Sequence, residues 1–92
     1  MKGLEAKTIS EKAKKGIYGI IYTSWNSEIV KDLLAETKKE LLNQGVSLEN
    51  IIIKEVPGAF ELPLATKLTA EMDNMSTVIS LGAIIQGDTP HF

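Results

Sequence analysis

His91 is the only histidine of this 92-residue sequence, and imidazole is the side chain whose ordinary pKa lies nearest to neutral pH. It is therefore a natural general acid or base. A lone histidine is more often structural or simply exposed. No serine or cysteine nucleophile motif and no paired carboxylates accompany it. His91 is thus the candidate for proton transfer.

Two other side chains could bind a flat molecule that carries hydroxyl groups. Trp25, the only tryptophan, could stack on a heterocycle, although an aromatic residue beside a strand more often caps the core. Glu61 could accept hydrogen bonds from hydroxyls, or could simply be favoured by the positive end of a helix dipole. Gly58 and Ala59 leave room for a ligand close to the backbone. Binding and structural roles both stay open here.

Residues 82–89 place two glycines after an apolar run, as a nucleotide-binding phosphate loop does. That loop needs a lysine after its second glycine, and this sequence has Asp88, which would repel phosphates. We therefore reject an NTPase. Thr89 and Pro90 are typical of a helix start, whose free N–H groups could still bind one phosphate. Because a helix does not normally end where it starts, we expect the polypeptide to continue beyond Phe92.

Composition places the chain among ordinary globular proteins. Hydrophobic residues make up 43% and charged residues 24% of the sequence, which suits one small domain over residues 1–92. A net charge of -2 argues against nucleic acid, and the lack of cysteine with a single histidine argues against disulfides and metal. No apolar run approaches the ~20 residues that span a bilayer, and the N-terminus lacks a secretory signal. We expect a soluble, cytoplasmic protein without a membrane partner.

Apolar runs rich in β-branched residues predict three buried strands, at residues 16–22, 51–56 and 77–81. The charged residues 7–15 would form an exposed arm or a short edge strand. Strands that alternate with helices imply a parallel sheet, and strands apolar on both faces imply helices on both sides. Ligands of such folds bind beyond the carboxyl ends of the strands, where the loops carrying Trp25, Glu61 and residues 82–91 would meet.

Two amphipathic segments predict the connecting helices. Apolar residues at helical spacing indicate a helix over residues 27–44, with Asn26 or Ser27 as its N-cap and Gly45 as its stop. Proline is tolerated in a first helical turn, so a second helix is expected to begin near Pro63. Its apolar face would hold Leu62, Ala65, Leu68 and Met72.

The loops resemble those of the lumazine synthase family. The matching motifs are Trp25-Asn26, residues 56–63 (Val-Pro-Gly-Ala-Phe-Glu-Leu-Pro) and residues 81–92 (Leu-Gly-Ala-Ile-Ile-Gln-Gly-Asp-Thr-Pro-His-Phe). The last two are specific, and the resemblance extends from Ile17 onward. It implies a flavodoxin-like α/β fold, a three-layer sandwich with a parallel sheet, and it implies that the family's C-terminal part is missing from this sequence.

The resemblance also implies an activity and an assembly. The activity is lumazine synthase, a transferase of riboflavin biosynthesis that condenses 5-amino-6-(D-ribitylamino)uracil with 3,4-dihydroxy-2-butanone 4-phosphate to 6,7-dimethyl-8-ribityllumazine, without cofactor or metal. The assembly is a homo-oligomer, a pentamer or a multiple up to a 60-subunit icosahedral capsid. Active sites would lie between neighbouring subunits, and riboflavin synthase would be a further partner.

Site roles follow from the same resemblance, residue by residue. His91 matches the catalytic proton-transfer residue, and Trp25 matches the aromatic residue that stacks on the pyrimidine ring. The other matches are substrate-binding positions, facing the pyrimidine at Ala59, Phe60, Glu61, Ala83, Ile84 and Ile85 and the butanone phosphate at Asp88 and Thr89. Amine attack, phosphate elimination and ring closure all move protons, which His91 could relay.

The sequence departs from the family in two respects. It lacks the family's C-terminal aromatic wall and phosphate-gripping arginine, and Ser24 replaces an arginine often found before the aromatic–Asn pair. One alternative is therefore an inactive fragment, or an assembly or ligand-binding piece of the same family. Archaeal-type riboflavin synthase shares the fold, but its loop differs from residues 59–61 of this sequence.

Overall fold

Three parallel strands form the central sheet of the computed structural model, which describes residues 9–84. They are β1 (Ile17–Thr23), β2 (Ile51–Val56) and β3 (Met75–Leu81), and their order across the sheet is β2-β1-β3. Both pairings with the central strand β1 are parallel. The parallel sheet predicted from alternating strands and helices is confirmed, and each strand lies within two residues of its predicted range.

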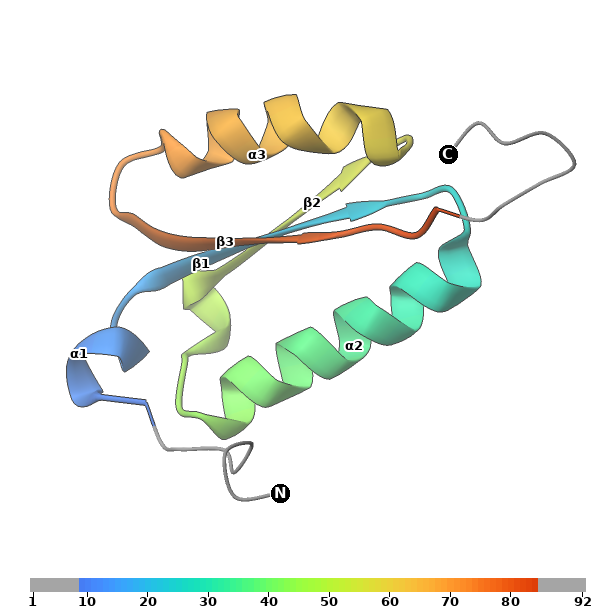
Figure 1. Ribbon diagram of the computed structural model, residues 1–92. Helices are drawn as coiled ribbons and strands as arrows, with labels where there is room; N and C mark the ends of the chain where they lie inside the picture. The colour runs from blue at the N-terminus through green and yellow to red at the C-terminus, as the bar shows by residue number, and fades with distance from the viewer. Residues whose placement is uncertain (1–8, 85–92) are drawn as a thin grey trace, which may run out of the picture.

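Helices cover the two faces of this sheet (Figure 1). Helix α2 (Ser27–Asn43) connects β1 to β2 and lies on one face, and α3 (Leu62–Ala70) connects β2 to β3 and lies on the other. Both helices contact β1 and β3. Short 3₁₀ turns, η2 (Leu48–Asn50) and η3 (Ala59–Glu61), lead into β2 and α3. The three-layer α/β sandwich of flavodoxin-like type is therefore confirmed.

The helix boundaries follow the residues that predicted them. Gly45 has a φ of 98° just beyond α2, so it supplies the left-handed conformation that ends the helix. Proline stands in the first turn of α3, where its missing N–H leaves no hydrogen bond unmade. Within residues 9–84, no helix is both long enough and apolar enough to cross a membrane.

The core of the sandwich is centred on β1. Ile20 and Ile21 point to opposite faces of the sheet and are both fully buried, as is Val30 of α2. Burying an aliphatic side chain of this size stabilises a fold by ~1.5–3 kcal/mol. The outer strand β2 is less covered, and Lys54 and Glu55 in it are exposed. The expectation of strands apolar on both faces is therefore wrong for β2.

Helix α3 presents a different face to the sheet from the one expected. Its fully buried residue is Thr69, whereas Leu68 is 57% exposed and Met72 lies in the turn beyond the helix. The cause is a close approach at Gly19, where an added Cβ would lie 2.9 Å from the Cγ2 atom of Thr69. Because Gly19 has no side chain, the helix approaches β1 through Thr69. The predicted apolar face is thus wrong at Leu68 and Met72.

A single helical turn, α1 (Glu11–Lys14), precedes β1. The hydroxyl of Ser10 caps it by accepting a hydrogen bond of 3.1 Å from the N–H of Ala13. Lys14 and Glu11 form an ion pair of 2.9 Å along the turn. The expected edge strand is therefore wrong for residues 11–14, where the cap and the ion pair favour a helical turn with no buried residue.

Candidate functional site

The loops that follow the three strands meet at the carboxyl edge of the sheet (Figure 1). The N–H of Ser24 donates to the carbonyl of Val56 at 2.9 Å, and the N–H of Trp25 donates to the carbonyl of Pro57 at 3.1 Å. These bonds extend the pairing of β1 with β2 beyond both strand ends. The loop after β1 is therefore fixed against the loop after β2, as the sequence predicts for a ligand site at this edge.

Asn26 joins the first loop to the third. It occupies the N-cap position of α2 with a left-handed backbone, φ 60° and ψ 45°, but its side chain does not cap the helix. Instead, Nδ2 donates to the carbonyl of Ala83 at 3.1 Å. The prediction of Asn26 or Ser27 as the cap is thus right about the position of Asn26 and wrong about the bond, because the amide reaches across to the segment after β3.

Trp25 is held through its backbone, while its ring is left in solvent. The hydroxyl of Thr23, a residue only 1% exposed, donates to the carbonyl of Trp25 at 3.2 Å. The side chain of Trp25 is 72% exposed. The interpretation of Trp25 as a cap on the core is therefore wrong, since a ring so exposed adds little to the packing. An exposed, anchored indole is instead suited to stacking on a planar ligand.

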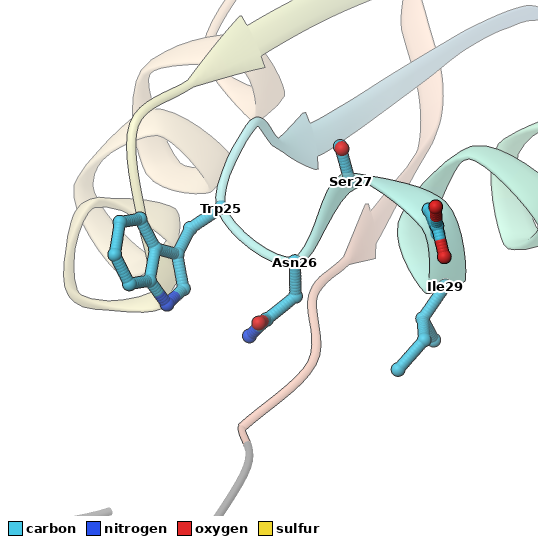
Figure 2. Close-up of a pocket in the computed structure, with 5 residues that line it drawn as sticks. Trp25, Asn26, Ser27 and Ile29 are labelled. Carbon is cyan, nitrogen blue, oxygen red and sulfur yellow. The ribbon is translucent and has the colours of Figure 1, made fainter.

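A shallow hollow of about 490 Å³ opens beside this indole. Its lining is the run of residues Trp25, Asn26, Ser27, Glu28 and Ile29. Figure 2 shows that the Trp25 ring, the Asn26 amide and the Ile29 side chain lie on one side of the loop, whereas Ser27 points to the other. The apolar side chains of Trp25 and Ile29 suit a flat ring, while the Asn26 amide is bonded to Ala83.

The loop after β2 adds a second aromatic ring and a carboxylate. Phe60 is 93% exposed. Glu61 ends η3 and stands at the N-cap of α3, yet its side chain does not cap that helix. Its Oε2 atom lies 3.3 Å from the point where a Cβ on Gly58 would stand, so the carboxylate folds back over the glycine. Glu61 is exposed, and its oxygens can accept hydrogen bonds from a ligand.

Gly82 allows the chain after β3 to pack against the start of α3 and the end of β1. A Cβ at this position would lie 2.8 Å from Cδ1 of Leu62 and 3.5 Å from Cγ2 of Thr23. Ala83, which accepts the hydrogen bond from Asn26, is half-buried, whereas Ile84 is 63% exposed. The remaining predicted site residues lie outside the described residues, and their roles stay predictions: Ile85, Asp88, Thr89 and His91.

A tyrosine–carboxylate pair lies on the strands below these loops. Tyr22 and Glu55 are register partners on β1 and β2, and the Tyr22 hydroxyl donates to Oε2 of Glu55 at 2.7 Å. This hydrogen bond, followed by desolvation and the charge of Glu55, raises the pKa of Tyr22 above 10.0. Sequence reasoning missed the pair because it depends on the strand register. Residues 9–84 contain no group of three or more side chains placed to hold a metal ion.

Sequence comparisons agree on one family. The model of the family described as 6,7-dimethyl-8-ribityllumazine synthase matches residues 16–92. Enzymes of that name from Parabacteroides distasonis and Porphyromonas gingivalis are 45% and 43% identical over 74 residues, which are 80% of this chain and 46% of each relative. The one from Protochlamydia amoebophila is 41% identical over all 92 residues and 52% of its own length. The chain spans about half the length of these relatives.

Proposed function

The chain belongs to the 6,7-dimethyl-8-ribityllumazine synthase family, and from this premise we propose that the intact protein forms 6,7-dimethyl-8-ribityllumazine. Its substrates would be 5-amino-6-(D-ribitylamino)uracil and 3,4-dihydroxy-2-butanone 4-phosphate. The observation that carries the proposal is the 72% exposed ring of Trp25, whose backbone is held at the junction of three loops. A planar pyrimidine is the kind of ligand that such a ring recognises.

The pyrimidine substrate is assigned to the first two loops. Its ring stacks on Trp25, beside the hollow that Asn26 and Ile29 line. Its ribityl hydroxyls donate to the exposed carboxylate of Glu61, which makes no competing bond to the start of α3. The neighbouring Phe60 offers apolar surface at the same edge of the sheet. These contacts would place the amine of the substrate beside the third loop.

The phosphate substrate and the proton transfers are assigned to the end of the sequence. Asp88 and Thr89 would bind the butanone phosphate through backbone N–H groups, and His91 would relay protons. The amine attacks the ketone and loses water to form an imine. The phosphate is then eliminated as inorganic phosphate, and the ribityl-bearing amine attacks the remaining carbonyl and loses a second water, which closes the ring. Holding both substrates together would itself supply about 7–11 kcal/mol of the barrier reduction.

We also propose that the intact protein assembles with copies of itself, in a pentamer or a multiple of it. The support is an apolar stripe at four-residue spacing along η3 and α3, formed by Phe60, Leu64 and Leu68, which are 93%, 64% and 57% exposed. Contiguous exposed apolar surface of this kind typically marks a protein contact. Because the resemblance to the family implies self-assembly, we propose that a second copy of the chain covers this stripe.

The direct test is product formation. The intact protein is mixed with both substrates, and the lumazine is followed by its absorbance and fluorescence and compared with the same mixture without protein. Saturable, protein-dependent formation is expected. Binding of both substrates without any acceleration would instead support the second candidate, an assembly or ligand-binding member of the family.

A further inference from the structure

We infer that Asn26 is a positioning residue, which fixes Trp25 relative to the chain after β3 and so sets the width of the ring-binding site. The inference rests on the proposed function, because it concerns how the site for the pyrimidine is held. It gives a role to the side chain of Asn26, which contacts the protein backbone. Three observations carry it: the bond of Asn26, its backbone conformation and the exposure of Trp25.

The bond of Asn26 crosses between two separate loops. The last register pair between β1 and β3 is Tyr22 with Leu81. Beyond that pair the strands no longer hold each other, and the Nδ2 of Asn26 donates to the carbonyl of Ala83, 57 residues along the chain. Within the described residues this is the hydrogen bond that joins the first loop to the third. The amide therefore continues the sheet contact with a side chain.

The backbone of Asn26 adopts the conformation that this bond requires. Its φ of 60° is left-handed, a region that asparagine tolerates better than most residues. An N-cap asparagine ordinarily has an extended backbone and accepts a hydrogen bond from the helix, and Asn26 does neither. The side chain of Asn26 therefore does not cap α2, and its amide bonds to Ala83 instead.

Trp25 depends on such loop contacts because its ring is not fixed by packing. The ring is 72% exposed. Its backbone N–H is held by Pro57 on the side of β2, and its carbonyl is held by the hydroxyl of Thr23. Asn26 supplies the attachment on the side of β3. Without it, the loop can move away from Ala83, and the space between the indole and the third loop is no longer defined.

The test replaces Asn26 with glycine in the intact protein. Glycine accepts a left-handed backbone without strain, so Asn26→Gly removes the amide and preserves the turn. The dissociation constant of 5-amino-6-(D-ribitylamino)uracil, measured by calorimetry, is expected to rise about 3- to 10-fold, as for the loss of one hydrogen bond. The rate constant for bound substrates is expected to change less than about 2-fold, because proton transfer is left in place. The fluorescence anisotropy of Trp25, the only tryptophan among these 92 residues, should fall in the free protein, with a Trp25→Phe variant as the blank for other emission.

Two further variants make the test specific. Asn74 has the same left-handed backbone, with φ 66°, in the turn before β3 at the opposite edge of the sheet. Asn74→Gly should therefore leave both the anisotropy and the dissociation constant unchanged. Asn26→Asp keeps the size of the side chain but cannot donate, and its charge would repel the carbonyl of Ala83, so it should behave like Asn26→Gly.

Separate readings distinguish this inference from the proposed function. If the wild-type protein does not bind the pyrimidine, the proposed function fails, and the anisotropy of the unliganded variants still decides whether Asn26 holds Trp25. The positioning role is overturned if the wild type binds the pyrimidine and both variants, Asn26→Gly and Asn26→Asp, have the same Trp25 anisotropy and the same dissociation constant as the wild type. A rate constant that falls while the dissociation constant is unchanged would also overturn it.

Discussion

At the scale of single residues, exposure divides the side chains of the carboxyl edge into two groups. Thr23 is 1% exposed, whereas the aromatic residues Trp25 and Phe60 are 72% and 93% exposed. This reverses the usual preference of large apolar groups for the interior. Thr23 can be buried because its hydroxyl is bonded to the carbonyl of Trp25. The polar residues thus build the support, and the aromatic residues are left for a ligand or a partner.

His91→Ala tests the proposed proton relay. Loss of a general acid–base group typically slows a reaction by ~10²–10⁴-fold, and the decrease should lie toward the lower end because imine formation also proceeds when the substrates are merely held together. Substrate dissociation constants should change little. Single-turnover mixing of both substrates with excess protein gives the rate, and a variant as fast as wild type would remove His91 from the mechanism.

Tyr22 and Glu55 give the sheet a predictable response to alkaline pH. The pKa of Tyr22 is raised above 10.0, first by its hydrogen bond to Glu55. A raised acid pKa means that the folded state favours the protonated phenol, so its stabilisation is full below pH 10.0 and is lost as pH rises through the raised value. Absorbance titration of the phenolate in a Tyr18→Phe background isolates this group.

The matched variant for this pair is Glu55→Gln. It keeps an acceptor but removes the charge, so the pKa of Tyr22 should return towards 10.0. The loss of thermal stability at alkaline pH should then become smaller, because the folded and unfolded pKa values of Tyr22 come closer together. A titration curve that does not move in Glu55→Gln would mean that the hydrogen bond of 2.7 Å does not persist in solution.

At the scale of elements, the position of α3 depends on the absence of a side chain at Gly19. A Cβ there would lie 2.9 Å from Cγ2 of Thr69 and 3.3 Å from the sulfur of Met75. The helix and two strands therefore meet at one point with no spare space. This contact also sets which residues α3 turns to solvent, including Leu64 and Leu68.

Gly19→Ala should therefore destabilise the protein. Overfilling a packed interior typically costs ~1–3 kcal/mol, and denaturant unfolding at equilibrium would measure the loss. Thr69→Ser removes the methyl group that the new Cβ would meet, so adding it to Gly19→Ala should restore part of the stability. Gly58→Ala is the control, since its Cβ would meet only the flexible carboxylate of Glu61. Equal stability of Gly19→Ala and wild type would contradict this account of the helix position.

The elements also show which structural features the sequence can predict. The strands followed from β-branched runs and the end of α2 from Gly45, because these signals are local. The buried face of α3 did not follow from its periodicity, because it is decided by Gly19, far away in the chain. The bond of Asn26 with Ala83 was also unpredicted, since it requires that β3 lies beside β1.

At the scale of the whole molecule, the strand order brings together loops that are far apart in sequence. Because β1 lies between β2 and β3, its loop contacts both of the others. The general location of the site therefore followed from the alternation of strands and helices. The roles of individual residues did not, since a lone tryptophan, glutamate or histidine has an ordinary structural use as well. Family resemblance supplied those roles, and they remain proposals.

Self-assembly is tested through the apolar stripe of Phe60, Leu64 and Leu68. Leu68→Lys should reduce the mass of the particle, because a charge buried in a contact carries a desolvation cost of several kcal/mol per ion, as an order of magnitude. Light scattering after gel filtration reports the mass. Leu48→Lys is the control, since Leu48 is 58% exposed but lies before β2 at the opposite edge of the sheet. An unchanged mass for Leu68→Lys would place the contact elsewhere.

The proposed function depends most on the stacking of Trp25 on the pyrimidine substrate at the junction of the three loops. Its most direct test is a fluorescence titration of the intact protein with 5-amino-6-(D-ribitylamino)uracil, in which the difference between wild type and Trp25→Phe gives the emission of Trp25. Saturable quenching is expected, with the dissociation constant found by calorimetry. Trp25→Phe should retain that constant, and Trp25→Ala should raise it about 2- to 13-fold, as the loss of an aromatic contact of ~0.5–1.5 kcal/mol implies. Calorimetric binding with unchanged emission, or with an unchanged constant in Trp25→Ala, would contradict the claim.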